Sequence, residues 1–264
     1  MRVTEINIYP IKSVGAISCE QRDVERQGLS GDRRFMLVDE RGRFITQRQY
    51  PRMALIRSEL KGRGYRFAAQ GLDPLELPVQ LSAGEQVEVT VWQDTPQALV
   101  ADSAINNWFS QALGLTCRLV FSQDEHRRSL SNGRGRAEDR VSFADGAPLL
   151  LTSEGSLMDL NDRLDKPVSM KRFRPNLVVD CEVPYAEDDW QMIAVGECEF
   201  EVAWSCSRCI LTTVDPATGE RDAGRQPLAT LKSYRDTADG PLFGSNLIPR
   251  KLGRISVGDP VRLL

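Results

Sequence analysis

The chain has 264 residues, enough for one large domain or two ordinary ones with a substantial hydrophobic core. Hydrophobic residues make up 41% and charged residues 27%, and the net charge of −3 gives no reason to expect a nucleic acid or an anionic membrane as partner. No apolar run approaches the ~20 residues that cross a bilayer, and the N-terminus lacks the long apolar region of a secretion signal, so we expect a cytoplasmic protein.

The first part of the sequence predicts mostly strands. The alternation in "VTEINIYPI" predicts a strand that ends at Pro10. The run "RRFMLVDERGRFITQRQ" predicts a hairpin with strands at 34–39 and 43–48 and a turn at Gly42. Further strands are expected at 53–60, 65–69, 85–92 and 117–121.

One helix interrupts these strands, and a polar segment follows them. Apolar residues at helical spacing predict a helix over 104–113, with Ser103 as its N-cap and Gly114 at its end. Residues 122–147 are polar and rich in Gly and Arg, and we interpret them as a solvated loop in preference to a docking or substrate loop. We expect the boundary between the two halves of the chain here, after residue 122.

The second half begins with a buried strand and a helix. The run "APLLLTSEGSLMDLNDRL" predicts a strand over 148–152 and a helix over 154–164 that Ser153 caps. Further strands are expected at 176–180, 190–197, 198–205 and within 253–264, and a short helix at 227–235. Many short strands, few helices and no doubly wound alternation predict a mixed, strand-rich α+β protein of β-barrel-like units with helical additions.

A single C-x-x-C, Cys206 and Cys209, is the most conspicuous chemical motif. A structural zinc site usually needs two Cys/His pairs, and this chain has one such pair and one histidine, His126. A thiol redox pair usually begins a helix, whereas the flanking runs "CEFEVAWS" and "ILTTV" are typical of strands. The residues alone leave a zinc clip, a redox couple, a disulfide and a single metal-ligating thiolate open.

Motifs of several common enzyme classes are absent. Neither G-x-x-x-x-G-K-[ST] nor G-x-G-x-x-G occurs, so nucleotide binding by those routes has no support. No G-x-S-x-G occurs either, and a lone His126 in a polar stretch is a poor general base, which argues against a hydrolase.

Cations and polar donors gather at the expected strand ends. Such groups suit an anionic ligand rich in heteroatoms, such as a phosphorylated pterin, although for each residue alone a surface charge beside a turn is the preferred interpretation. They are Lys12, Ser13, Arg34, Arg48, Arg174 and Asn176.

Several ordered segments resemble a known family. "YPIKS", "FRPNLVV", "CSRCILTTVDPATGERD", "LKSYR", "GPLFG" and "VGDPV" occur here in one order, and together they resemble the MOSC family, in particular the mARC/YcbX branch of molybdenum-cofactor enzymes. The resemblance runs from about residue 3 to residue 264. It implies an N-terminal MOSC-associated β-barrel domain over 1–122 and a MOSC β-barrel domain over 123–264.

The resemblance also implies roles for individual residues. Cys209 would bind the molybdenum of a molybdopterin cofactor, and Cys206 would have no metal role. The implied cofactor contacts are Lys12, Ser13, Arg34, Arg174, Asn176 and Ser207 and, more loosely, Gly146, Ala147 and Asn246.

The chemistry of the residues agrees with this implication. A thiolate is a soft metal ligand, and molybdenum already held by the two sulfurs of the pterin needs only one more. We expect Arg208 to favour that thiolate and the run "ILTTV" to hold Cys209 at the edge of a sheet. Asp215 is a candidate catalytic group that would orient a substrate or a proton, and a turn-forming role before Pro216 competes with it.

The resemblance implies a reductase of N-hydroxylated compounds, namely hydroxylamines, amidoximes and N-hydroxylated bases, which would be a detoxifying reaction. The alternative is a non-catalytic MOSC module that carries molybdopterin or handles sulfur. The C-x₄-C-x₂-C spacing of an iron–sulfur domain does not occur, so we expect electrons from a separate ferredoxin, haem protein or flavin reductase.

Overall fold

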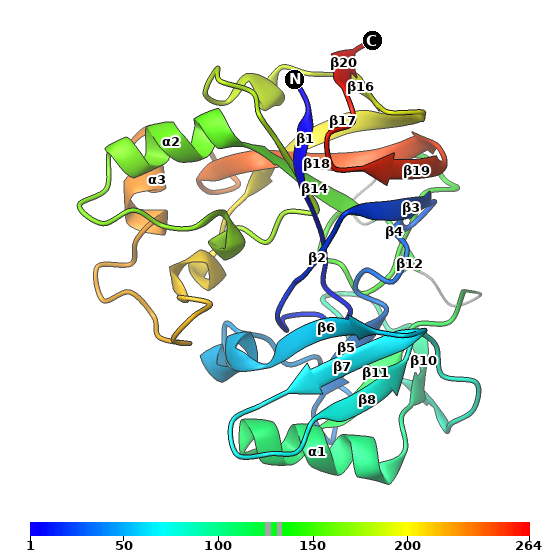
Figure 1. Ribbon diagram of the computed structural model, residues 1–264. Coiled ribbons are helices and arrows are strands. Elements are labelled where there is room, and N and C mark those ends of the chain that lie inside the picture. The colour runs from blue at the N-terminus through cyan, green and yellow to red at the C-terminus, as the bar shows by residue number, and fades with distance from the viewer. Residues whose placement is uncertain (125–127, 131–133) are drawn as a thin grey trace.

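The computed structural model describes residues 1–124, 128–130 and 134–264, and His126 lies outside them. Figure 1 shows two lobes: α2 and α3 flank the strands of the upper lobe, and α1 lies beneath the strands of the lower lobe. Twenty strands and three α-helices are described, so the prediction of a mixed, strand-rich fold is confirmed.

An eight-stranded sheet forms the upper lobe. Its order is β2 (Ile17–Cys19), β1 (Val3–Ile8), β15 (Leu177–Val179), β14 (Leu149–Ser153), β18 (Leu242–Lys251), β17 (Cys198–Ser207), β16 (Met192–Val195) and β20 (Val261–Leu263). Only β14 and β15 run parallel among these pairs, and α2 (Glu154–Asp162) lies in the crossover that joins them. Strand β1 belongs to this sheet although it begins the chain, so strand pairing crosses the predicted boundary at residue 122, which itself stays a prediction.

Smaller sheets complete the two lobes. The lower lobe has the sheets β5 (Phe35–Val38), β11 (Arg118–Phe121), β10 (Gln97–Val100), β9 (Gln86–Glu88) and β6 (Arg57–Lys61), β7 (Gly64–Ala68), β8 (Leu75–Pro78). The remaining sheets are β19 (Gly253–Ser256), β3 (Gln21–Glu25), β4 (Gly28–Leu29) and β12 (Arg128–Ser129), β13 (Arg140–Val141).

The helix signals of the sequence were mostly right. Helix α1 (Ser103–Leu113) ends at Gly114, whose φ of 67° is left-handed, as predicted. Its N-cap, however, is Asp102, which accepts a hydrogen bond from the Ile105 amide at 2.9 Å, so the choice of Ser103 was wrong by one residue. Ser153 caps α2 as predicted. The third helix, α3 (Leu228–Tyr234), fills the predicted range 227–235.

Several predicted strands are shorter in the structure: only β9 forms within 85–92, and two other segments change conformation. The 53–60 segment begins inside the 3₁₀ helix η1 (Pro51–Leu55), which has proline in its first turn, and only its second part joins β6. The 43–48 arm of the predicted hairpin makes two isolated bridges, from Phe44 to Val38 and from Arg43 to Thr90, and then turns. In both segments the apolar residues predicted extended backbone, and the structure has a turn there instead.

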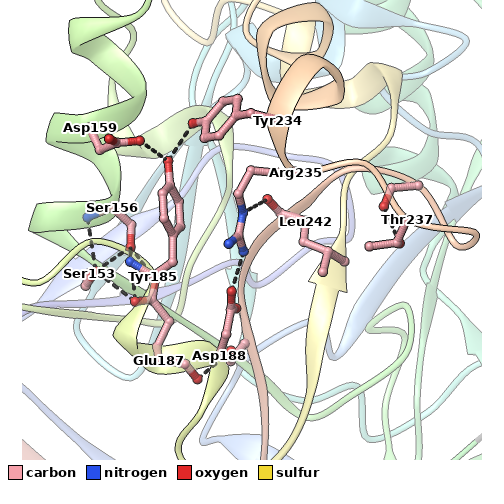
Figure 2. A network of polar contacts seen from close by, with 12 residues as sticks. Ser153, Ser156, Asp159, Tyr185, Glu187, Asp188, Tyr234, Arg235, Thr237 and Leu242 are labelled. Atoms are coloured by element: carbon pink, nitrogen blue, oxygen red, sulfur yellow. Dashed lines mark hydrogen bonds and ion pairs between the residues drawn. The ribbon is translucent and has the colours of Figure 1, made fainter.

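A polar network fixes the helices of the upper lobe (Figure 2). The Tyr185 hydroxyl donates to Asp159 of α2 at 2.8 Å and lies 2.5 Å from the Tyr234 hydroxyl at the end of α3. Glu187, in the 3₁₀ helix η5 (Ala186–Asp188), accepts hydrogen bonds from the hydroxyls of Ser153 and Ser156 at the start of α2. These bonds hold α2 and α3 against the sheet that carries β14 and β18.

The two lobes share one hydrophobic core. A single cluster of buried side chains runs from Ile6 and Ile193 in the upper sheet to Phe35, Phe67 and Phe109 in the lower lobe. A continuous core fixes the two lobes relative to each other, which a site built from both of them requires. None of the helices among the described residues is long and apolar enough to cross a membrane.

Candidate functional site

A cavity of about 850 Å³ opens where strand ends of both halves of the chain meet. Its walls contain most of the residues that the sequence singled out. These are Lys12, Ser13, Gly146, Ala147, Arg174, Asn176, Ser207, Cys209 and Asn246. A volume of this size suits a cofactor or a small ligand.

The end of β1 and the start of β5 form one wall. The Lys12 amide donates to the Phe35 carbonyl at 2.8 Å, and the Arg33 amide donates to the Tyr9 carbonyl at 2.7 Å. These two backbone bonds hold the segment that carries Lys12 beside the segment that carries Arg33. Both side chains line the cavity.

Two guanidinium groups lie against the Tyr9 ring. Arg33 is 4.4 Å and Arg174 is 4.1 Å from the ring centroid, distances typical of cation–π contacts. Arg174 Nη1 donates to the Val14 carbonyl at 2.8 Å, whereas its buried Nη2 has no hydrogen-bond partner among the described residues. Because an unpaired buried donor is costly, this nitrogen marks a place for an anionic acceptor.

Asn176 holds the Arg33 side chain in place. Its Oδ1 accepts from Arg33 Nη1 at 2.8 Å and from the Leu150 amide at 3.1 Å, and its Nδ2 donates to the Asn7 carbonyl at 3.0 Å. The side chain is fully buried. Asn176, just before β15, therefore connects Arg33 to β1 and β14.

An ion pair joins the buried Lys12 to the exposed carboxylate of Asp145. Lys12 Nζ also donates to the Phe143 carbonyl at 2.7 Å. Burial lowers the pKa of Lys12 to about 8, with Asp145 acting in the opposite direction. Partial desolvation at the cavity wall works against the charge of Asp145, but the Lys12 ammonium outweighs it and holds the pKa of that carboxyl well below its usual range. At neutral pH both groups are charged.

Another part of the cavity wall carries Cys206, near the end of β17, and Cys209, just after it. Cys209 is exposed, and it precedes the 3₁₀ helix η6 (Ile210–Thr213) rather than a strand, which corrects the expectation for "ILTTV". The cause is local: the Thr212 hydroxyl donates to the Cys209 carbonyl at 3.0 Å, and the Thr213 hydroxyl donates to the Ile210 carbonyl at 2.7 Å. These bonds offset the strand propensity of threonine.

Two predicted site residues lie elsewhere. Arg34 does not line the cavity, because its Nη2 donates to the Ser122 carbonyl at 2.9 Å and to Asp124 at 2.7 Å. Asp215 is also not among the lining residues, and its carboxylate accepts from Arg172 at 3.0 Å. Arg33, rather than Arg34, thus lines the cavity together with Lys12 and Arg174, and we call these three residues the cation cradle. Asp215 instead forms an ion pair with Arg172.

Sequence reasoning also missed the aromatic residues of the cavity. Trp92 and Trp204 line it, and neither stood out from the tryptophans of an ordinary core. Trp92 has a left-handed φ of 58°, which is unusual for a bulky residue and is not visible in a single sequence. Arg48, which the sequence did single out, lines the cavity beside it.

The cavity wall carries two chemically different groups of residues. Lys12 is buried and Arg33 and Arg174 are partly buried, and together they form a cationic wall that suits phosphate or another anion. The exposed Cys209 thiol, elsewhere in the cavity wall, is a soft ligand for a metal. Both sets of residues line the same cavity, so one ligand that has an anionic group and a soft metal fits them together.

Comparison with known proteins identifies the family of this chain. The profile of the MOSC N-terminal beta barrel domain matches residues 1–116, and that of the MOSC domain matches residues 138–262. The mitochondrial amidoxime-reducing component 1 of Mus musculus is 36% identical over 99% of this chain and 82% of its own length. That of Homo sapiens is 35% identical over 99% and 82%. Component 2 of Rattus norvegicus is 35% identical over 98% and 82%. This chain is a member of the MOSC-domain family, in the branch of the amidoxime-reducing components.

Proposed function

We propose that this protein binds a molybdenum cofactor and reduces N-hydroxylated compounds with electrons from a separate donor protein. The observation that carries the proposal is the shared cavity, which is lined by the exposed Cys209 and also by Lys12, Arg33 and Arg174. Relatives that are named for amidoxime reduction cover nearly the whole chain, which supports the same reaction class.

The residues of the cavity fit the cofactor. Cys209 would supply the one protein sulfur that molybdenum needs beyond the two of the pterin. The unpaired Arg174 Nη2 and the Lys12 ammonium would bind its phosphate. Ser13, Ser207 and Asn246 line the cavity and would fix the ring system, while Gly146 and Ala147 allow the backbone to approach.

When bound, the cofactor supplies a two-electron reduction, in which R–NH–OH, two protons and two electrons give R–NH₂ and water. The protein positions the reacting centre. Because Cys209 is exposed and lines the cavity, an N–OH group would approach a metal held by its sulfur through this cavity. The ion pair of Lys12 and Asp145 and the contacts of Asn176 with Arg33 hold the binding wall rigid.

We further propose that the electrons come from a ferredoxin, a small haem protein or a flavin reductase, so that NADH alone does not drive turnover. The cytoplasmic location expected from the sequence stays a prediction, while the relatives are named as mitochondrial.

The test uses protein purified from cells that make the cofactor. Dithionite-reduced benzyl viologen replaces the natural donor, and conversion of benzamidoxime to benzamidine is followed by chromatography. We expect the wild type to oxidise two equivalents of reduced viologen for each benzamidine formed, and Cys209→Ser to show background rates. A molybdenum-loaded wild type that forms no benzamidine would contradict the reductase and support a carrier module.

A further inference from the structure

Arg48 is a cation of the cavity wall that belongs neither to the cation cradle nor to the segment that carries Cys206 and Cys209. Arg48 is partly exposed, and its guanidinium lies 4.4 Å from the Trp92 ring centroid and 5.8 Å from that of Phe44. The two rings are themselves 5.2 Å apart. Arg48 thus rests on an aromatic platform at the cavity wall.

The platform is held in a fixed position. The Trp92 indole N–H donates to Asp145 at 2.9 Å, and Asp145 is in turn paired with Lys12. The left-handed φ of 58° at Trp92 is a strained conformation for a bulky side chain, and 47% of the residue is exposed. Strain of this kind that tertiary contacts hold in place is typical of functional sites.

Arg48 differs from the other arginines of the cavity in its contacts. Arg33, Arg134, Arg174 and Arg208 each donate at least one hydrogen bond from the guanidinium to a protein atom. Within the part of the chain that the structure describes, no such bond is found for the guanidinium of Arg48. Its N–H groups are therefore available to a ligand, while one face of the group is covered by Trp92.

The surrounding charges favour an anion. Six cations and two carboxylates are found among the described residues that line the cavity. Both carboxylates are already engaged, since Asp145 pairs with Lys12 and Asp94 accepts from Arg128 Nε at 2.6 Å. The charge of Arg48 is thus left without a directly bonded carboxylate, on a wall that is positive overall.

We propose that Arg48 is a specificity-determining residue that binds a carboxylate or phosphate group of the substrate. This inference rests on the proposed function, and it deepens it: the favoured substrate carries an anionic group besides its N–OH group. The planar guanidinium, stacked on Trp92, offers a pair of N–H donors to two oxygens at once. The cofactor phosphate has its own cradle at Arg174 and Arg33, so Arg48 is free for the substrate.

The test compares two probes that differ in one group, benzamidoxime and its 4-carboxylate, with reduced benzyl viologen as electron source. The variants are Arg48→Gln, Arg48→Lys and the control Arg43→Gln. Arg43 is exposed, lies in the same segment and does not line the cavity. For Arg48→Gln we expect kcat/KM of the carboxylate probe to fall at least about tenfold, mainly through KM, because a hydrogen-bonded charge is lost.

The matched measurements separate this role from others. We expect kcat/KM of benzamidoxime to change less than about twofold in Arg48→Gln, Arg48→Lys to keep part of the preference for the carboxylate, and Arg43→Gln to keep all of it. Molybdenum content should match the wild type in every variant. Equal losses for both probes, or loss of molybdenum in Arg48→Gln, would overturn the proposal.

A binding measurement keeps the inference separate from the proposed function. If the wild type reduces neither probe, the proposed function fails, and calorimetric titration of the same protein with both probes still tests Arg48. We expect the carboxylate probe to bind more tightly than benzamidoxime, and Arg48→Gln to remove this difference. Equal affinity of the wild type for both probes would refute the role of Arg48.

Discussion

Arg208 donates a hydrogen bond from Nη1 to the Cys206 sulfur at 3.0 Å, while its Nη2 donates to the Phe173 carbonyl at 2.6 Å. The sequence had led us to expect that this arginine would favour the thiolate of Cys209. Instead, its bonds hold the first cysteine of the C-x-x-C motif and leave the second exposed to the cavity. The two cysteines therefore have different environments, as a site with a single metal-ligating thiolate requires.

The assignment of the cation cradle to Arg33 can be tested against its neighbour. Arg33→Gln should lose most of the bound pterin and molybdenum, because Arg33 lines the cavity beside Arg174. Arg34→Gln should retain both but lower the free energy of unfolding by about 1–3 kcal/mol, since it leaves the Ser122 carbonyl and Asp124 with one partner fewer. Metal analysis, pterin fluorescence and urea unfolding measure these effects. Cofactor loss confined to Arg34→Gln would contradict the assignment.

Anion binding by the empty protein should depend on the charge of Lys12. Burial lowers the pKa of Lys12 to about 8, and an anion binds best while this side chain is protonated. The affinity for sulfate, whose charge is constant above neutral pH, should therefore fall as the pH rises through 8, by up to about tenfold per pH unit.

Calorimetric titrations with sulfate at several pH values measure this dependence. Lys12→Arg is the matched variant, because a guanidinium stays charged throughout this range and should flatten the profile. Unfolding follows the same linkage: the unfolded chain binds the Lys12 proton more tightly, so the free energy of unfolding should rise as the pH increases from 8 towards 10.5. A sulfate affinity of the wild type that does not change around this pKa would argue against a binding role for Lys12.

The N-cap of α1 gives a test of the fold that is independent of the site. Asp102→Ala should lower the free energy of unfolding by about 1 kcal/mol, because its carboxylate caps the Ile105 amide. Ser103→Ala, one residue on, should change it by at most a few tenths of that amount, since alanine is a good helix former at the first helical position. Urea unfolding of the two variants compares them. A larger loss for Ser103→Ala would mean that the sequence-based choice of cap was right after all.

How far the sequence predicted the structure depended on how local the cause was. Ser153 and Gly114 were placed correctly because capping and left-handed backbone follow from the residue itself. The whole of β18 was missed, because its Gly244, with a φ of 75°, and its Pro249 are residues that usually end strands. Long-range pairing with β17 outweighs that local preference.

The same difference between local and long-range causes applies to the site residues. Cys209, Lys12 and Arg174 were placed in the cavity through motifs, without knowledge of the fold. The choice between Arg33 and Arg34 was beyond the sequence, because Arg33 lies in a turn with a left-handed φ of 46° just before β5, and nothing local predicts this conformation for an arginine. Tertiary contacts decide it.

The central claim is that the Cys209 sulfur alone, among the thiols of this protein, anchors a molybdenum-bearing pterin. The most direct test is the molybdenum content of wild type, Cys206→Ser and Cys209→Ser, purified identically from cells that make the cofactor. We predict near-stoichiometric metal in the first two proteins and almost none in the third, with all three equally folded. Equal metal content in both serine variants, whether retained or lost, would contradict the account.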